Sequence, residues 1–437
     1  MMRNRSLVAL LATIALLLPI SSMAVQQGGS SEASGAALGA IGDRAGLYEQ
    51  AEKRLRERLQ RYPQDHEASL LLALIEFKSG YFDEALSEID GLLKREPKFH
   101  LAYLIQGDLL LARTRVVSDI GSNQLLGGID SPQEIDLLRQ EAEARLNAYL
   151  DSLPQGRLPR ALLALDEEVK SALLVDKRSH RLYVYEREMD GTPRLVQDFY
   201  VSTGKANGNK KLSGDLRTPE GVYFITRHIP GDKLPDLYGI SAYPMNYPNE
   251  WDQRQGKTGY GIWLHGTEAA YYSRPPLDSE GCVVLPNLDL STVARFLRPG
   301  VTPIVVSDRV EWLERDAYLG LRKEVAAAVE KWRVDWQSGD VERYLSHYDN
   351  AFWSDGYNLS SWQQRKRRVA QGKEWQRVEL SDLSLFAYPR AAGNGREMMV
   401  VNLNQKYDSN NYSSEMGKRL YLVKAEDSWR VLYEGGR

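Results

Sequence analysis

The 437-residue chain contains a single cysteine, Cys282, so no intrachain disulfide can stabilise its fold. Its domains must therefore be held together by buried hydrophobic cores. At roughly 150 residues per domain, this length suggests about three domains. The formal net charge is −3 and no run of basic residues has the length of a nucleic-acid-binding arm, so nothing in the sequence indicates binding to nucleic acid.

The amino terminus has the pattern of a secretory signal peptide over residues 1–24. Two arginines precede an apolar run at residues 7–18, and a small-x-small cleavage site ends at Ala24. The run is shorter than the ~20 residues that cross a bilayer, although an uncleaved anchor is the alternative interpretation. We therefore expect a periplasmic protein with no stable membrane span after cleavage. Residues 25–45 are rich in Gly, Ser and Ala, which is typical of a flexible linker.

A helical, self-similar pattern with a period of thirty-four residues follows. The residues that recur one period later are Ala51, Leu55 and Leu59, which become Ala85, Ile89 and Leu93. This is the period of the tetratricopeptide (TPR) repeat, whose helix pairs stack to bury their apolar faces. We predict a helical, TPR-like domain over residues 46–168, with one helix starting at Pro132 after Ser131 as N-cap and a last helical pattern ending at Glu168. Such a domain either binds a protein partner or a second copy of the chain, or it caps the neighbouring domain.

Residues 171–308 change to a mostly β pattern. Residues 172–175 and 182–185 flank a short polar stretch, which predicts a β-hairpin. Further strands are expected at residues 196–202, 221–227, 260–264 and 302–307, with one helix over residues 287–298. Residues 316–437 begin with a helical pattern and continue with strands, which is an α+β order. The fold class predicted for the whole chain is multidomain α+β.

The lone cysteine lies seventeen positions after His265. A thiolate is a strong nucleophile, and a neighbouring imidazole keeps it available by accepting the thiol proton. The competing interpretation is a small buried apolar residue, because free cysteines often pack in cores. No His, Cys, Asp or Glu cluster has metal-ligand spacing, so we expect neither a metal nor a cofactor.

Three further residues are expected to shape this site. Strand alternation places Trp263 beside His265 as an aromatic wall, and Gly266 leaves the backbone open to a substrate. Gly281, directly before the thiol, permits unusual backbone angles and close approach by a ligand. Backbone N–H groups near Gly281 and Cys282 are suited to stabilise an oxyanion.

The arrangement His265-Gly266, twelve residues, then Ser279-x-Gly281-Cys282 resembles the signature of the L,D-transpeptidases of peptidoglycan, the YkuD-type domain family. The resemblance covers roughly residues 171–308. It implies that Cys282 is the nucleophile and His265 its proton acceptor and donor. It also implies that Ser279 and Gly281 shape the loop and the oxyanion site.

The family resemblance implies that the substrate is the tetrapeptide stem of peptidoglycan. Cys282 would attack the carbonyl between the L-centre of the diamino acid and the terminal D-alanine. D-alanine would then leave, and a thioester would remain on Cys282. An amine of a neighbouring stem would then form a 3→3 cross-link, as in an L,D-transpeptidase. The alternative acceptor is water, which would trim the stem to a tripeptide, as in an L,D-carboxypeptidase.

Two positions beside the thiol depart from the family pattern. Most members have a histidine where this chain has Glu280, and an asparagine or arginine where it has Val284. A positive group there favours thiolate, so we expect a cation elsewhere in the sequence, namely Lys210, Lys211 or Arg217, to replace it. A third alternative is an inactive scaffold that gathers cell-wall enzymes.

The carboxy-terminal residues 316–437 resemble the NTF2/SnoaL-like cone, with residues at matching positions that include Trp332, Tyr344, Phe352 and Trp362. The cone is either a pocket for glycan or peptide or a fold-stabilising partner whose aromatic residues form the core. The order of the three domains resembles that of the cell-shape-determining peptidoglycan carboxypeptidases of helical bacteria. This order is the main reason for the hydrolytic alternative, and the altered residues beside the thiol, Glu280 and Val284, are a second reason.

Overall fold

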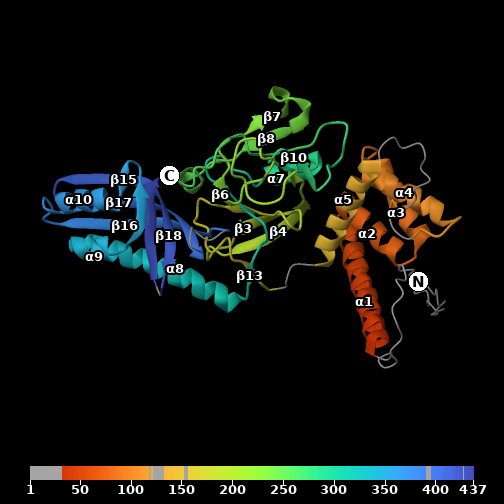
Figure 1. Ribbon diagram of the computed structural model, residues 1–437, viewed down its shortest axis with the longest axis horizontal. Coiled ribbons are helices and arrows are strands. Elements are labelled where there is room, and N and C mark those ends of the chain that lie inside the picture. Colours follow the sequence, from red (N-terminus) through yellow and green to blue (C-terminus); the bar gives the residue numbers. More distant parts are fainter. Residues whose placement is uncertain (1–31, 118–119, 122–131, 152–155, 390–394, 427) are drawn as a thin grey trace, which may run out of the picture. The chain divides into compact units, whose positions relative to one another are not determined.

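The computed structural model describes residues 32–117, 120–121, 132–151, 156–389, 395–426 and 428–437 (Figure 1). Residues 1–47 form one compact unit and residues 48–437 another. The predicted signal peptide, residues 1–24, lies outside the described residues. Within the described residues, no helix is long and apolar enough to cross a membrane.

The predicted flexible linker over residues 25–45 is wrong from residue 32 onward. Helix α1 (Glu32–Arg61) already begins there. Alanine has the highest helix propensity of all residues, and several alanines among residues 33–45 offset the glycines of this stretch. Residues 25–31 lie outside the described part of the chain.

Four more helices build the TPR-like region: α2 (His66–Lys78), α3 (Phe82–Arg95), α4 (His100–Ala112) and α5 (Pro132–Leu150). Helix α2 starts at Asp65, whose side chain accepts a hydrogen bond from the Ala68 N–H and so satisfies one free donor of the first turn. Helix α5 starts at Pro132 as predicted, while its predicted N-cap, Ser131, lies outside the described residues. The equivalent residues of the repeat are fully buried: Ala51, Leu55, Ala85 and Ile89.

The helical pattern predicted up to Glu168 is wrong. The stretch instead contains strand β1 (Leu158–Pro159), which pairs with β13 (Trp312–Leu313). The Leu163 N–H then donates to the Leu385 carbonyl at 2.9 Å, so this segment lies along the edge of the carboxy-terminal sheet. A short apolar run beside a proline fits a strand as well as a helix, and the free sheet edge decides the outcome.

The central domain contains two main sheets. The five-stranded sheet has the order β4 (Pro193–Tyr200), β3 (Arg181–Arg187), β2 (Ser171–Asp176), β12 (Pro303–Ser307), β6 (Gly221–Phe224). The four-stranded sheet has the order β11 (Val283–Val284), β9 (Trp263–His265), β8 (Ser241–Pro244), β7 (Ile229–Pro230). The predicted hairpin is confirmed, since β2 and β3 pair antiparallel from Ser171 opposite Glu186 to Asp176 opposite Arg181.

Shorter elements complete the central domain. Strands β5 (Thr203–Gly204) and β10 (Leu277–Ser279) pair in parallel, while α6 (Glu250–Arg254) and α7 (Asn287–Ala294) are its α-helices. Two 3-10 turns, Gly231–Lys233 and Asp236–Tyr238, lie between β7 and β8. A buried core joins both main sheets and α7, with members that include Leu173, Val184, Leu264, Val283 and Leu290. This core fixes β9 and β11, the strands that carry the site.

The carboxy-terminal domain consists of three helices and a six-stranded sheet. The helices are α8 (Arg315–Gln337), α9 (Val341–Leu345) and α10 (Leu359–Ala370). The sheet has the order β15 (Tyr357–Asn358), β14 (Tyr348–Ser354), β19 (Ser428–Gly436), β18 (Tyr412–Ala425), β17 (Met398–Ser409), β16 (Gln376–Ala387). The predicted α+β order is confirmed.

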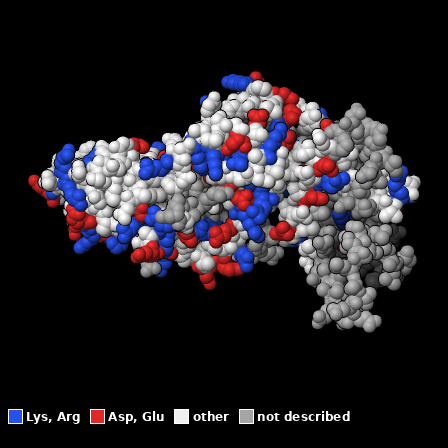
Figure 2. Space-filling model, in the orientation of Figure 1, with Lys and Arg blue, Asp and Glu red and all other residues white. Residues whose placement is uncertain are grey.

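The central and carboxy-terminal domains share one core. Residues from the five-stranded and six-stranded sheets meet in it, among them Leu174, Val222, Phe386 and Tyr421. At its margin the Arg419 guanidinium pairs with the Glu250 carboxylate at 2.9 Å. On the surface, Figure 2 shows Lys and Arg side chains interspersed with Asp and Glu across the visible face, in keeping with the near-balanced formal charge.

Candidate active site

The fold brings the predicted nucleophile and base onto neighbouring strands. His265 is the last residue of β9, and Cys282 directly precedes β11. The two strands pair in parallel with Val283 opposite Leu264 and Val284 opposite His265. In this register Cys282 lies at the level of Trp263, two residues before His265.

The contacts of His265 determine its tautomer. Its Nδ1 atom lies 2.6 Å from the Gly266 carbonyl oxygen, which can only accept a hydrogen bond. Nδ1 therefore carries the proton, and in the neutral ring Nε2 keeps its lone pair. The side chain is only 3% exposed, and burial lowers the pKa of His265 to about 4. At neutral pH the residue is a neutral imidazole with Nε2 as a proton acceptor.

Cys282 is half-buried, and its Sγ atom lies 3.6 Å from the Gly261 carbonyl oxygen. Burial raises the pKa of the Cys282 thiol to about 11, because a thiolate is poorly solvated there. The Trp263 backbone N–H and the Arg274 guanidinium act in the opposite direction and lower this pKa. At neutral pH the thiol and the imidazole are therefore both in their neutral forms.

Ser279 and Gly281 shape the loop in front of the thiol. The Ser279 hydroxyl donates to the Cys282 carbonyl oxygen at 2.6 Å and accepts from the Gly281 N–H at 3.1 Å. Gly281 has a φ of 128°, and a Cβ at this position would lie 2.8 Å from the Arg217 carbonyl oxygen, so only glycine fits. The Gly281 N–H, expected to bind an oxyanion, is engaged by Ser279, which leaves the Cys282 N–H as the candidate donor.

The expectation that Gly266 leaves the backbone open to a substrate is wrong. Gly266 is buried, and a Cβ there would lie 2.1 Å from the Asn287 Oδ1 atom. Glycine is needed here so that Asn287 can approach and so that the Gly266 carbonyl can orient His265. The aromatic ring at the imidazole is that of Tyr238, 5.0 Å from His265, and the Trp263 ring lies 4.8 Å from that of Tyr238.

Arg274 is the cation with the largest effect on the pKa of Cys282, and sequence reasoning did not identify it. Its guanidinium is buried, pairs with Glu268 at 2.6 Å and donates to the Leu237 carbonyl at 2.9 Å. Its charge lowers the pKa of both Cys282 and His265. Arg274 is the one basic residue between His265 and Cys282 in the sequence, and this position is the signal by which it could have been found.

The residues that depart from the family pattern occupy different environments. Glu280 is exposed but still raises the pKa of Cys282, whereas Val284 is buried opposite His265. Of the three predicted replacement cations, Lys210 lowers the thiol pKa, although less than Arg274 does, and it is itself paired with Asp215 at 2.8 Å. Lys211 is exposed, and Arg217 contributes its backbone carbonyl to the wall behind Gly281.

A second concavity lies in the carboxy-terminal domain. It has a volume of about 910 Å³ and is lined by aromatic residues that include Trp336, Tyr344 and Trp362. The Lys366 ammonium sits 4.3 Å from the Trp362 ring centre. Trp332 and Phe352, in contrast, are 1% and 2% exposed and belong to the core. The cone therefore contains both core aromatics and a cavity, and a ligand for the cavity stays a prediction.

Comparison with known proteins agrees with this architecture. The L,D-transpeptidase catalytic domain (YkuD) family matches residues 170–306. The structure of Bd1075 from Bdellovibrio bacteriovorus is 30% identical, with a TM-score of 0.57, over 64% of this chain and 98% of that one. This chain belongs to the L,D-transpeptidase (YkuD) family. Its relatives identify it more broadly as a peptidoglycan-modifying protein of the L,D-transpeptidase/carboxypeptidase type.

The other domains of this YkuD-family protein also match known families. A tetratricopeptide repeat matches residues 44–107, and the Cds6 C-terminal NTF2-like domain matches residues 324–435. The helical cell shape determining protein Pgp2 from Campylobacter jejuni is 26% identical, with a TM-score of 0.54, over 63% of this chain and 95% of that one. The predicted three-part organisation is thereby confirmed. A search of curated proteins finds no match.

Proposed function

We propose that this protein is an L,D-carboxypeptidase that trims peptidoglycan tetrapeptide stems to tripeptides through a Cys282 thioester. The observation that carries the proposal is the contact between His265 Nδ1 and the Gly266 carbonyl. This contact leaves the proton on Nδ1 and the lone pair on Nε2. His265 ends β9, which pairs with β11, the strand that begins directly after Cys282. The YkuD family supplies the substrate class, the tetrapeptide stem.

In the acylation step, Nε2 of His265 takes the thiol proton while Sγ attacks the carbonyl before the terminal D-alanine. The Cys282 N–H stabilises the oxyanion. The C–N bond then breaks, and the imidazolium returns its proton to the departing D-alanine amine. A thioester between Cys282 and the tripeptide remains.

In the deacylation step, Nε2 deprotonates a water molecule that attacks the thioester carbonyl. The C–S bond breaks, the thiolate regains a proton from the imidazolium, and the tripeptide leaves with a new carboxylate. Each step returns His265 to the neutral state in which the structure holds it.

The two pKa values indicate general-base catalysis rather than a preformed ion pair. The thiol pKa of about 11 exceeds the imidazole pKa of about 4 by about 7. Moving the proton in the resting site therefore costs on the order of 10 kcal/mol before the two charges attract each other. Because the thiol is neutral in the resting site, Cys282 should react slowly with an alkylating agent near pH 6 even if the enzyme is active. Slow alkylation therefore does not distinguish an active enzyme from an inactive scaffold, and analysis of the reaction products does.

Water is favoured as acceptor by the domain order and by the similarity to a protein described as a helical cell shape determinant. The second candidate is L,D-transpeptidation, and it is favoured by Glu280. This exposed carboxylate lies directly before Gly281 and Cys282 and is placed to hold the ammonium group of an acceptor stem.

The test is incubation of the purified protein with tetrapeptide muropeptides, with products read by mass spectrometry. A carboxypeptidase yields tripeptide monomers and free D-alanine, whereas a transpeptidase yields 3→3 dimers. Cys282→Ala must abolish either product, and the proposal fails if this variant stays active or if wild type yields neither. Glu280→Gln is the matched variant: it is expected to reduce dimers and to leave tripeptide formation unchanged.

The location of this substrate fits the predicted signal peptide. Peptidoglycan stems lie outside the cytoplasmic membrane, so the proposal requires export of the chain. The periplasmic location, and a protein partner or self-association through the helical region, stay predictions.

A further inference from the structure

The segment between the two site residues is attached to the TPR-like region. This active-site segment, residues 266–276, connects β9 to β10. Tyr272 from its centre is 7% exposed and belongs to the core of the helices, with its ring 4.3 Å from that of Phe99. Its backbone N–H donates to the Lys98 carbonyl at 3.1 Å, and the Lys98 ammonium donates to the Ala269 carbonyl at 2.7 Å.

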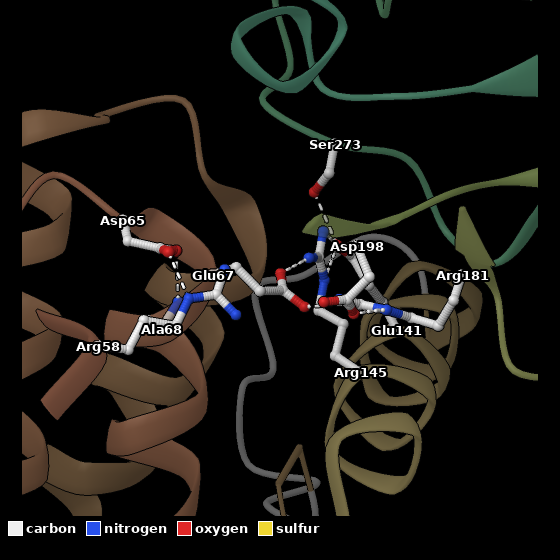
Figure 3. A network of polar contacts seen from close by, with 9 residues as sticks. All are labelled: Arg58, Asp65, Glu67, Ala68, Glu141, Arg145, Arg181, Asp198 and Ser273. Carbon is white, nitrogen blue, oxygen red and sulfur yellow. Dashed lines mark hydrogen bonds and ion pairs between the residues drawn. The ribbon is translucent and has the colours of Figure 1, made fainter. Parts of the chain in front are cut away.

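A polar network fixes the next residue of the segment. The Ser273 hydroxyl donates to the Glu141 carboxylate of α5 at 2.7 Å (Figure 3). Glu141 also pairs at 2.7 Å with Arg145, which is 1% exposed and pairs in turn with Glu67 of α2. Glu67 completes the connection to the central domain through Arg181 of β3, at 3.0 Å.

The residue after Ser273 is Arg274, the cation of the site. Its carbonyl accepts a hydrogen bond from the Tyr200 hydroxyl at 2.9 Å, and the Arg145 guanidinium lies 3.7 Å from the centre of the Tyr200 ring. Its guanidinium is held at the other end by Glu268 and the Leu237 carbonyl. The Arg274 backbone is thus held by Tyr200 of β4, whose ring contacts Arg145 of α5, and its guanidinium is held by Glu268 and the Leu237 carbonyl.

We propose that the TPR-like region is a positioning element of the active site, which holds Arg274 in place through Tyr272 and Ser273. This goes beyond the cap that the sequence allows, because the contacts reach the specific segment that carries Arg274, whose charge lowers the pKa of the Cys282 thiol. This proposal rests on the proposed function only in one respect, namely that tripeptide formation is the reaction whose rate is measured. The reactivity of the thiol reports on it without any substrate.

The polar network of Ser273, Glu141 and Arg145 holds the active-site segment in one position relative to α5. Buried ion pairs add little net stability when compared with apolar packing, but removing one partner is costly because the other charge is left buried. Glu141 and Arg145 are both almost fully buried, so the active-site segment cannot shift away without breaking the Ser273 contact to this pair. The geometry therefore couples the docking of the helices to the position of Arg274.

The experiment is a double-mutant cycle on the single thiol of the full-length protein. The rate constant for alkylation of Cys282 by iodoacetamide is measured for wild type, Tyr272→Ala, Arg274→Gln and the double variant, together with kcat/KM for tripeptide formation. If Tyr272 acts through Arg274, each single change raises the thiol pKa by about one unit and lowers the alkylation rate about tenfold. The double variant is then no slower than Arg274→Gln.

Two controls separate positioning from general packing. Tyr272→Phe keeps the ring in the helical core and is expected to react at the wild-type rate. Tyr103→Ala removes an exposed ring of α4 and is expected to leave both rates unchanged. Additive losses in the cycle, or a Tyr272→Ala protein with wild-type alkylation and kcat/KM, would overturn the proposal.

Ser273→Ala covers the case in which Tyr272→Ala does not fold. It removes one hydrogen bond to Glu141 and is expected to slow alkylation roughly two- to fivefold, but not in the Arg274→Gln background. Equal losses in both backgrounds contradict positioning through Arg274. If Cys282→Ala retains turnover, the proposed function fails, while the alkylation cycle still decides the role of the helices.

Discussion

The Cys282–His265 site and the cavity of the carboxy-terminal domain both bury ionisable groups, but they treat charge in opposite ways. Cys282 and His265 contact mainly backbone atoms and aromatic rings, and both are driven towards their neutral forms. Glu434, at the cavity wall, is buried as well, yet the nearby Lys418 and Lys366 outweigh the effect of burial and hold its pKa below the usual range.

The difference shows that the partner, rather than burial alone, decides the charge state. A carboxylate with an ammonium at hydrogen-bond distance keeps its charge, as Glu434 does with Lys418 at 2.5 Å. Groups without such a partner stay neutral, which suits a site where a proton must move during the reaction. The Glu434–Lys418 pair at the cavity wall is therefore held in its charged form, whereas Cys282 and His265 are held in neutral forms between which a proton can be transferred.

The largest effect is expected from removing the base of the site. His265→Ala should lower kcat for tripeptide formation by about 10²–10⁴, because the thiol then has no proton acceptor. Steady-state kinetics on tetrapeptide muropeptides measure this. Retention of more than about a tenth of the wild-type rate would assign the base to another group.

The pH dependence of the same reaction checks the direction of the His265 shift. His265 must be neutral to act, so kcat/KM should fall only as the pH drops through about 4 and stay level at neutral pH. An acidic limb near pH 6.5 would show that the imidazole is solvated as in a free histidine.

Breaking the ion pair at the cavity wall should have the next largest effect. Glu434→Leu leaves the buried Lys418 ammonium without its partner and should lower the free energy of unfolding by about 3–5 kcal/mol in urea titration. The double variant Lys418→Met/Glu434→Leu should recover most of this loss. As a matched control, Glu342→Ala removes an exposed pair with Arg367 and should change nothing measurable.

A smaller effect of opposite sign is expected at Lys366. Burial lowers the pKa of Lys366 to about 8, so the folded state binds its proton more weakly than the unfolded chain does. Wild-type stability should therefore rise as pH increases from about 8 to about 10.5. Lys366→Met should stabilise the protein by about 1–3 kcal/mol at pH 7 and lack this rise. Destabilisation at pH 7 would instead indicate that contacts with Trp362 dominate.

The smallest effect is expected from Ser279→Ala. This change removes the hydroxyl that joins the Cys282 carbonyl to the Gly281 N–H, and each hydrogen bond contributes about 1 kcal/mol. A three- to thirtyfold decrease in kcat/KM should follow, with the free energy of unfolding changed by less than about 2 kcal/mol. A loss as large as that of Cys282→Ala would give Ser279 a chemical role.

Local sequence patterns predicted much of the fold. The thirty-four-residue period predicted the TPR-like helices, and two apolar runs on either side of a polar stretch predicted the hairpin of β2 and β3. The prediction failed where a short apolar run met a free sheet edge, at residues 158–168, and where alanines outweighed glycines in α1. In both places neighbouring structure or composition outweighed a weak local signal.

The site divides in the same way. The residue types and spacing of His265 and Cys282 indicated their chemistry, and Gly281 was correctly tied to unusual backbone angles. The role of Gly266 was misjudged because the approach of Asn287, twenty-one residues later, is invisible in the sequence. Arg274 was missed because its guanidinium reaches the site only after the active-site segment folds back.

The sequence by itself determined the three-part organisation and indicated Cys282 and His265 as the candidate pair, because repeats, alternation and motif spacing are local properties of the chain. The tertiary structure alone decided that His265 is held as the Nδ1-protonated tautomer, that burial keeps the thiol neutral, and that the helices hold the segment carrying Arg274. Those features depend on solvent exclusion and on contacts between residues far apart in the chain, such as Ser273 and Glu141. No local pattern encodes them.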